Sequence, residues 1–495
     1  MSVRGARFNL GPNLDLKEFL KYVILLGLYG VAAPLLGVLL RKRPAAQRWT
    51  LGLVCFMTLG GLLAPAEWGL TLSAFEYRGH ERGYHFYFAE VPALALIVAK
   101  FLEDWRRFRW LPPGLWLYLA YVFFSFVSIL NAPAPSYVCM AAFKFLKVSI
   151  FFVAAYNYLR DEGDLEFFLR AMAYAILWEL VVVLKMKYMN GVYQVAGTFE
   201  HQNALSMFVT LIGMIFLAAA LGPKRPGATL FFVAYIACAA IQQSTLSRGG
   251  LVIFAAGTAG VCLLSLAQRM TVRRMAILGS LAAVGFVGLV MTMDTIIARF
   301  HDYGNESSQK TRELLNVASR RMLSDYPLGI GWNNFALTIN KPWPYGKVID
   351  DWERAGGVTV DENAPKGIVE SHYYLLLSET GYQGYLSYLL FISVFLWWNF
   401  RGVIAFRNHF LGAVSLGIGF GTGMNYVQSL LERVLTQPRN MMLWMMLLAV
   451  TARIELWRRS RARQLRSRKL PVAIRPEQHQ PSPRQPRHRQ PEGTI

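Results

Sequence analysis

The sequence predicts an all-α membrane protein, a polytopic transmembrane bundle of about 12–13 helices with one large polar loop. Apolar stretches of ~20 residues, the length that crosses a bilayer as a helix, recur along the whole chain. One polar interruption of ~70 residues, 298–370, divides them, and so long a loop between helices is uncommon without a function. Only 16% of the 495 residues are charged, whereas soluble domains carry ~25%.

The expected spans follow one another at short intervals on both sides of the large loop. In chain order they are 19–40, 50–66, 88–102, 115–130, 137–158, 167–189, 204–221, 230–246, 250–267, 275–297, 374–399, 410–431 and 441–456. Their lengths match, or nearly match, the hydrocarbon core of a bilayer. The stretch 70–87 is the least clear segment and is compatible with a position at the membrane interface.

The basic residues predict the orientation of these spans. Basic clusters occupy the short loops 41–48, 103–110, 223–227 and 268–274 and the segment after 457, which assigns that side to the cytoplasm. The large loop is then expected on the opposite side. Arg4 and Arg7 in the N-terminal segment contradict this rule for an odd number of spans, and an even number would return them to the cytoplasm.

The net charge of +21 lies largely in these loops and in the C-terminal segment, which argues against nucleic-acid binding. Residues 458–495 are rich in Arg, Pro and Gln, so we expect a disordered basic cytoplasmic tail with affinity for anionic membrane lipids. The four cysteines, Cys55, Cys139, Cys238 and Cys262, lie far apart in or beside apolar stretches. They have neither metal-ligand spacing nor the pattern of a disulfide framework.

Four polar stretches are predicted on the side of the large loop, and the first two lie at the ends of spans. In 197–208, His201 and Asn203 stand at a helix entrance, where polar side chains either cap the first turn or bind substrate. In 244–252, Arg248 lies between two apolar helices. An arginine at membrane depth is costly and usually has a partner or a function, and its planar guanidinium suits phosphate oxygens.

The third stretch, 310–335, belongs to the large loop. Leu315, Ser319 and Met322 have helical spacing with Arg312, and Pro327 and the glycines after it should end that helix. Arg312, Arg320 and Arg321 are candidates for phosphate binding, although a solvated helix face explains the last two equally simply.

The fourth stretch, 369–391, opens a further span. His372 stands at its mouth, and Glu379 lies about two turns further on the same face. A histidine can act as a general base near neutral pH, so His372 is a catalytic candidate. Asp350 and Asp351 lack a third ligand at a suitable spacing, so no metal site is predicted.

Taken in order, these stretches resemble the O-antigen ligase and O-antigen polymerase superfamily of bacterial inner membranes. The matching segments are GTFEHQN at 197–203, SRG at 247–249, Arg312 with Pro327, GIGWNNF at 329–335, and His372 with ETG at 379–381 and Gly384. The resemblance covers 197–391, and the N-terminal half matches in hydropathy alone. It implies a GT-C-like bundle with one large periplasmic loop.

The resemblance divides the chain into four parts. They are N-terminal transmembrane helices at 1–196, a catalytic region at 197–399 that includes a periplasmic loop at 298–372, C-terminal transmembrane helices at 400–457, and the tail at 458–495. It places the protein in the bacterial inner membrane as a multi-pass enzyme with its active site facing the periplasm.

The implied activity is that of a glycosyltransferase, without a metal or other cofactor, in polysaccharide biosynthesis. A glycan would pass from undecaprenyl diphosphate to a hydroxyl of lipid A core, a growing polysaccharide or a protein, with inversion. Arg248 and Arg312, with Arg320 and Arg321 as further candidates, would bind the diphosphate and stabilise its charge. His201 and Asn203 would contact substrate, and His372 would take the proton of the acceptor hydroxyl.

One departure from the family pattern concerns the base. His372 stands seven residues before Glu379, and Glu370 occupies the position at which many members have histidine. Either His372 acts from a shifted place, or Glu370 replaces it, or the chemistry differs. Glu379 is the third catalytic candidate in this segment, beside His372 and Glu370.

Two other functions remain open at the level of sequence. A polysaccharide or lipid-linked saccharide transporter would use a charge inside the spans, such as Lys144, Lys147, Glu179, Lys185 or Glu379, as part of a pathway. A non-catalytic assembly protein that kept the fold would tolerate the displaced histidine. Internal repeats, which many transporters show, are not apparent in the sequence.

Overall fold

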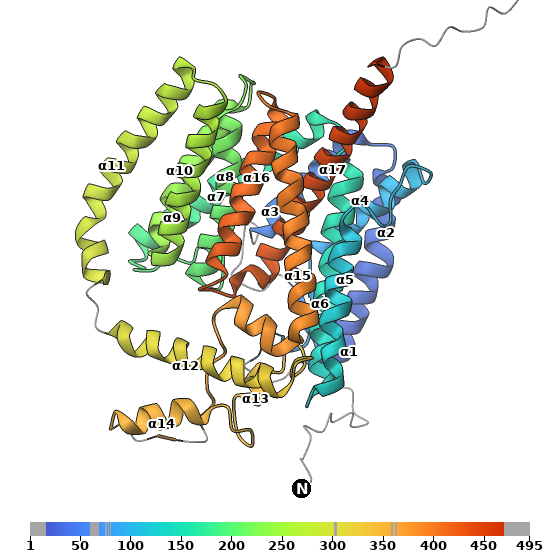
Figure 1. The fold of residues 1–495 in the computed structure, drawn as a ribbon. Helices are drawn as coiled ribbons and strands as arrows, with labels where there is room; N and C mark the ends of the chain where they lie inside the picture. Colours follow the sequence, from blue (N-terminus) through green and yellow to red (C-terminus); the bar gives the residue numbers. More distant parts are fainter. Residues whose placement is uncertain are drawn as a thin grey trace, which may run out of the picture.

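A computed structural model describes residues 16–59, 69–74, 77, 79, 81–300, 304–357, 360–361 and 364–469. Of the described residues, 76% are in helices and 2% in strands, and most helices run side by side in one bundle (Figure 1). Within the described residues, seven helical segments are long and apolar enough to cross a membrane. They are Leu16–Leu40, Pro135–Tyr158, Glu162–Met189, Gln202–Leu221, Ala228–Thr245, Arg248–Gln268 and His372–Ala405.

Every span predicted from the sequence overlaps a helix, and seven of the thirteen predicted spans coincide with these seven segments. Residues 60–66 of the predicted span 50–66 lie outside the described residues. The elements before the large loop are α1 (Leu16–Leu25), η1 (Leu26–Ala32), α2 (Ala33–Leu40), α3 (Pro44–Thr58), β1 (Gly69–Leu72), β2 (Tyr84–Tyr87), α4 (Glu90–Glu103), α5 (Leu115–Phe126), η2 (Val127–Asn131), α6 (Pro135–Tyr158), α7 (Glu162–Leu184), η3 (Lys185–Met189), α8 (Gln202–Leu221), α9 (Ala228–Thr245), α10 (Arg248–Gln268) and α11 (Val272–Phe300). The remaining elements are α12 (Gly304–Asp325), α13 (Phe335–Thr338), α14 (Lys347–Ala355), α15 (His372–Ala405), α16 (Phe410–Gln428), η4 (Val434–Thr436) and α17 (Pro438–Lys469).

Local sequence explains where several helices begin. Pro44 and Pro135 occupy the first turns of α3 and α6, where a missing N–H costs nothing. The Asp161 carboxylate accepts the Asp164 N–H at 2.8 Å and caps α7. The Ser247 hydroxyl accepts the Gly250 N–H at 3.4 Å at the start of α10.

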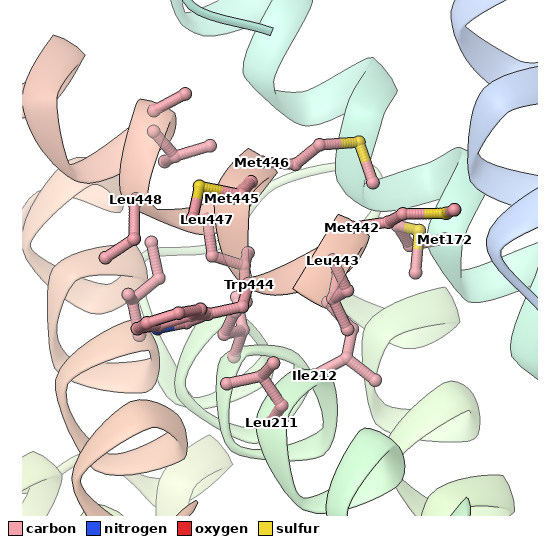
Figure 2. Close-up of a cluster of buried hydrophobic side chains, with 14 of the residues drawn as sticks. Met172, Leu211, Ile212, Met442, Leu443, Trp444, Met445, Met446, Leu447 and Leu448 are labelled. Atoms are coloured by element: carbon pink, nitrogen blue, oxygen red, sulfur yellow. The ribbon is translucent and has the colours of Figure 1, made fainter. Parts of the chain in front are cut away.

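The core of the bundle surrounds α8, which is buried from Ala204 to Leu221 and packs against α9, α10, α16 and α17. Apolar residues of α17 pack against Leu211 and Ile212 of α8 and against Met172 of α7 (Figure 2). A helix that is apolar on all sides is stable only when other helices enclose it. These contacts therefore make α8 the interior helix of the bundle.

The large loop forms a compact cap across one end of the bundle, with α12 running beneath the helix ends (Figure 1). Leu315, Ser319 and Met322 are buried on one face of α12, as their spacing predicted. Leu315 and Met322 join a second apolar cluster with Phe335 of α13 and Ile349 of α14. We call this end of the bundle the loop end.

Two segments differ from expectation. The region 70–87 is the least clear segment in the sequence. There the structure has an antiparallel pair of strands, which joins Gly69 to Tyr87 and Leu72 to Tyr84. The predicted disorder from 458 is wrong for 458–469, because α17 continues to Lys469. Arg458 and Arg459 contact Glu455 at 2.6 and 2.8 Å, and such pairs one turn apart support a helix. Residues 470–495 of the predicted tail lie outside the described residues.

Candidate active site

Two motifs named in the sequence analysis, the turn after Pro327 and the ETG segment at 379–381, meet at a break in α15. Gly381 has φ +67°, a conformation that L residues rarely adopt, and the helix is interrupted there. The turn after Pro327 fills the break. The N–H groups of Ile330 and Gly331 donate to the carbonyls of Ser378 at 2.9 Å and Glu379 at 3.1 Å. We call the turn 327–331 together with 378–382 the glycine seam.

The Glu379 side chain completes the glycine seam. Its carboxylate accepts the backbone N–H of Phe335 at 3.0 Å and that of Asn333. Glu379 is buried, and a charge-assisted hydrogen bond in that setting is strong. The structure therefore gives Glu379, which the sequence offered as catalytic, a position in which it holds the turn.

A similar contact fixes the GTF segment. Gly197 has φ +58°, and a Cβ built on it would lie 2.0 Å from Oε1 of Glu179. The Glu179 carboxylate accepts both the N–H and the hydroxyl of Thr198 at 2.8 Å. Arg439 of α17 donates to the Thr198 carbonyl and stacks on Phe199 at 5.1 Å. These bonds set the direction in which Glu200 and His201 leave the segment.

A pocket of about 460 Å³ opens at the loop end, and we call it the polar pocket. It lies among the β1–β2 hairpin, α6, the start of α8, the segment before α15 and the segment between α16 and α17. Its charged and histidine lining residues are Glu81, Arg82, His85, Lys144, Glu200, His201, Glu370, Glu432 and Arg433.

Cations and carboxylates alternate around the polar pocket. The Lys144 ammonium lies 2.5 Å from the Glu81 carboxylate, and both side chains are almost fully buried. Arg82 is exposed and Arg433 is half-buried in the lining. Guanidinium groups bind phosphate oxygens through several donors, so this lining suits an anionic ligand.

The structure brings four of the sequence-predicted residues to this pocket. His201 and Glu370 line it directly. Asn203 donates to Oε1 of Glu432 at 2.7 Å, and Arg312 of α12 pairs with Oε2 of Glu370 at 2.6 Å. Residues separated by more than 200 positions in the sequence therefore meet at one site.

His372 lies beside the polar pocket and not in its lining. It is buried in a cavity of about 20 Å³, with the Tyr388 ring 5.3 Å away and edge-on. The Glu81–Lys144 pair and Thr436 line both this cavity and the polar pocket. A cavity of that size holds about one water molecule, so a sugar in the polar pocket does not reach the imidazole unless the pair separates.

The remaining predicted arginines lie outside the pocket lining. Arg248 is half-buried at the first turn of α10. Arg320 donates to the Tyr374 hydroxyl at 2.7 Å and covers its ring at 5.2 Å. Arg321 is exposed on α12. The structure thus does not gather the predicted phosphate-binding arginines around one point.

The surroundings shift several pKa values at the pocket. Burial, and after it the nearby Glu370 carboxylate, raises the pKa of Glu432 to about 7. Burial raises the pKa of Glu81, although Lys144 opposes the shift. Burial, and then Lys144 and Lys147, lowers the pKa of His85 to about 4, so this imidazole is neutral at pH 7. Burial also lowers the pKa of Arg433.

Sequence reasoning missed most of the pocket residues. Glu81 and Arg82 fall in the segment that resembled neither a clear span nor a clear loop. Lys144 carried a usable signal, since a lysine inside an apolar span is costly, but it pointed equally to a transport pathway. Glu432 and Arg433 directly follow a predicted span, where charged residues are common and carry little information.

The arrangement has the parts needed to bind an anionic group and to accept a proton beside it. Within the described residues, no group of three His, Cys, Asp or Glu side chains is placed to hold a metal ion. Neither the comparison with protein-family models nor the search of curated proteins found a match to the chain.

Proposed function

We propose that the chain is a membrane glycosyltransferase that moves a glycan from undecaprenyl diphosphate to an acceptor hydroxyl, in the manner of an O-antigen ligase or polymerase. One observation carries the proposal. A polar pocket of about 460 Å³, lined by Arg82, Lys144 and Arg433, opens at one end of an otherwise apolar helical bundle. A lipid-linked diphosphate needs both parts, cations for its phosphates and an apolar surface for its chain.

In the proposed reaction the cations of the polar pocket bind the diphosphate. Negative charge grows on the bridging oxygen as the bond to the sugar breaks, and fixed cations stabilise this charge. Arg312 reaches the pocket through its ion pair with Glu370 and adds positive charge there. Arg82 and Arg433 supply the charge neutralisation, because Lys144 is already paired with Glu81, and we expect EDTA to leave the transfer rate unchanged.

The acceptor enters the same pocket from the loop end. Lipid A core, a growing polysaccharide and a protein hydroxyl remain equivalent candidates, because each presents a hydroxyl to the same donor. Under this proposal the loop end faces the periplasm and the basic end, with Arg458 and Arg459, faces the cytoplasm. Membrane lipids surround the bundle in the bacterial inner membrane.

A host that lacks its own enzyme provides the test. The double variant Arg82→Ala/Arg433→Ala should abolish surface polysaccharide on a gel and cause the lipid-linked donor to accumulate, while the protein remains in the membrane. Arg354→Ala, which removes an exposed arginine of α14 at the same end, is the matched control. Polysaccharide at the wild-type level in the double variant would contradict the proposal.

A transporter is the second candidate, and the buried pair Lys147–Glu90 at 2.6 Å favours it. Both charges lie inside the helical bundle, where ionisable groups often mark a pathway. Loss of a transporter would leave the lipid-linked glycan in the cytoplasmic leaflet, whereas loss of a periplasmic transferase would leave it in the outer leaflet. Labelling the accumulated donor with a membrane-impermeant reagent separates the two.

A further inference from the structure

We propose that Glu432 is the general base that takes the proton of the acceptor hydroxyl; this assignment rests on the proposed transferase function. Glu432 lies in the turn between α16 and α17, next to Arg433 in the sequence, and it lines the polar pocket. Base and phosphate-binding cation would thus stand on adjacent residues of one turn.

The geometry holds one oxygen of Glu432 and turns the carboxylate toward the pocket. Asn203, in the first turn of α8, donates to Oε1 at 2.7 Å. The turn itself is fixed, because the Glu432 N–H donates to the Gln428 carbonyl at 3.0 Å and α17 begins at Pro438. A carboxylate fixed at one oxygen can direct its second oxygen at an incoming hydroxyl without losing orientation.

The charges that act most strongly on Glu432 come from three segments. Glu370 approaches from the segment before α15, Arg312 from α12 and Arg433 from its own turn. Burial and Glu370 raise the pKa of Glu432 to about 7, against the opposing effect of Arg312 and Arg433. A base whose pKa lies near the working pH combines an adequate deprotonated fraction with useful basicity.

The three catalytic candidates identified from the sequence, His372, Glu379 and Glu370, are engaged or enclosed. His372 lies in its small cavity behind the Glu81–Lys144 pair. The Glu379 carboxylate is occupied by the backbone N–H groups of Phe335 and Asn333. Glu370 lines the pocket, but its Oε2 is already paired with the Arg312 guanidinium at 2.6 Å.

The step can be written so that all atoms balance. The acceptor hydroxyl loses its proton to the Glu432 carboxylate while its oxygen forms a bond to the anomeric carbon. The bond from that carbon to the diphosphate oxygen breaks, and the oxygen keeps the electron pair. The products are the glycosylated acceptor, inverted at the anomeric carbon, and undecaprenyl diphosphate. The proton on Glu432 then passes to water.

The experiment uses purified full-length protein added to solubilised membranes of a deletion host, which supply both donor and acceptor. Consumption of the undecaprenyl-diphosphate-linked glycan is followed between about pH 5 and about pH 9, a range that covers the titration of a carboxylate with raised pKa. Donor binding is measured in parallel. The variants are Glu432→Gln, Glu432→Asp and Glu370→Gln, with Glu313→Gln of α12 as the control.

We expect Glu432→Gln to lower the rate ~10²–10⁴-fold, the usual contribution of a general base, and to leave donor binding within about threefold. Because the base must be deprotonated, the wild-type rate should rise with pH up to about 7 and then level off. The glutamine variant should lose this rise, and the aspartate variant should keep it at a lower rate. Glutamine retains an oxygen for Asn203, so the fold is expected to persist.

Two outcomes would overturn the assignment while the transferase function stands. One is a Glu432→Gln variant that keeps more than a third of the wild-type rate. The other is a Glu370→Gln variant that alone loses both rate and pH dependence, which would move the base to Glu370. Wild-type protein that consumes no donor would instead overturn the proposed function, and the assignment with it.

Discussion

The polar pocket and the glycine seam lie at the same end of the bundle and are built in opposite ways. The glycine seam joins two short motifs through backbone hydrogen bonds, and the Glu379 carboxylate accepts the N–H of Phe335 beside them. The polar pocket collects charged residues from five separate segments, and Glu432 and Arg433 belong to its lining. The contrast teaches that a conspicuous motif can build the support of a site while its chemistry comes from scattered residues.

The largest expected effect tests the wall between the polar pocket and the His372 cavity. Lys144→Met would leave the Glu81 carboxylate buried without its partner at 2.5 Å. Breaking a buried pair in this way costs ~3–5 kcal/mol, so we expect a clear loss of thermal stability in detergent. The double variant Glu81→Gln/Lys144→Met should recover most of that loss. An unchanged melting temperature in Lys144→Met would mean that water solvates the Glu81 carboxylate.

The next effect belongs to the glycine seam. In Gly381→Ala, the new Cβ would meet the Leu328 and Pro327 backbone at 2.4 Å, in a conformation with φ +67°. The conformation alone costs ~1–2 kcal/mol, and the contact with backbone atoms adds to it. We expect thermal stability and transfer to fall together. Gly279→Ala of α11, whose added Cβ meets nothing within 4 Å, is the control.

The sequence predicted the helices well because their signal is local. An apolar stretch of spanning length can be recognised without knowledge of its neighbours, and each predicted stretch overlaps a helix. The α12 helix and the glycine turn after it were likewise predicted from the spacing of Leu315, Ser319 and Met322 and from Pro327. Hairpin formation at 70–87 and the extension of α17 to Lys469 depend on pairing and charge contacts that hydropathy does not measure.

The candidate site was predicted less completely because it is a matter of long-range contacts. His201, Asn203, Arg312 and Glu370 were identified from the sequence, and they meet at the polar pocket. The partner of Asn203 is Glu432, more than 200 residues away, and no local pattern connects the two. Long-range contacts also explain why the sequence did not separate His372 from the pocket residues. Its enclosure depends on Glu81 and Lys144, which are distant from it in the chain.

A smaller effect would sharpen the role of Glu379. Glu379→Gln keeps the shape of the side chain but removes the charge that receives the N–H groups of Phe335 and Asn333. Hydrogen bonds to charged groups contribute ~1.5–3 kcal/mol, and glutamine retains part of this, so we expect a loss near the lower value. Transfer should fall no further than the loss of folded protein explains. A ~100-fold lower rate at unchanged stability would instead return Glu379 to the chemistry.

The smallest effect separates arginines that resemble one another in sequence. Arg320 and Arg321 lie on the same helix as Arg312, but only Arg312 reaches the polar pocket, through Glu370. Arg320→Ala loses a contact with exposed Tyr374 atoms, and Arg321→Ala removes an exposed side chain. Substitutions at such positions change free energies by ~0.5 kcal/mol or less, so each rate should stay within about twofold of wild type.

Arg312→Ala, measured in the same membranes, should reduce the rate far more, because it removes positive charge beside the diphosphate and releases Glu370. Equal effects of all three changes would mean that the face of α12, and not the polar pocket, receives the donor.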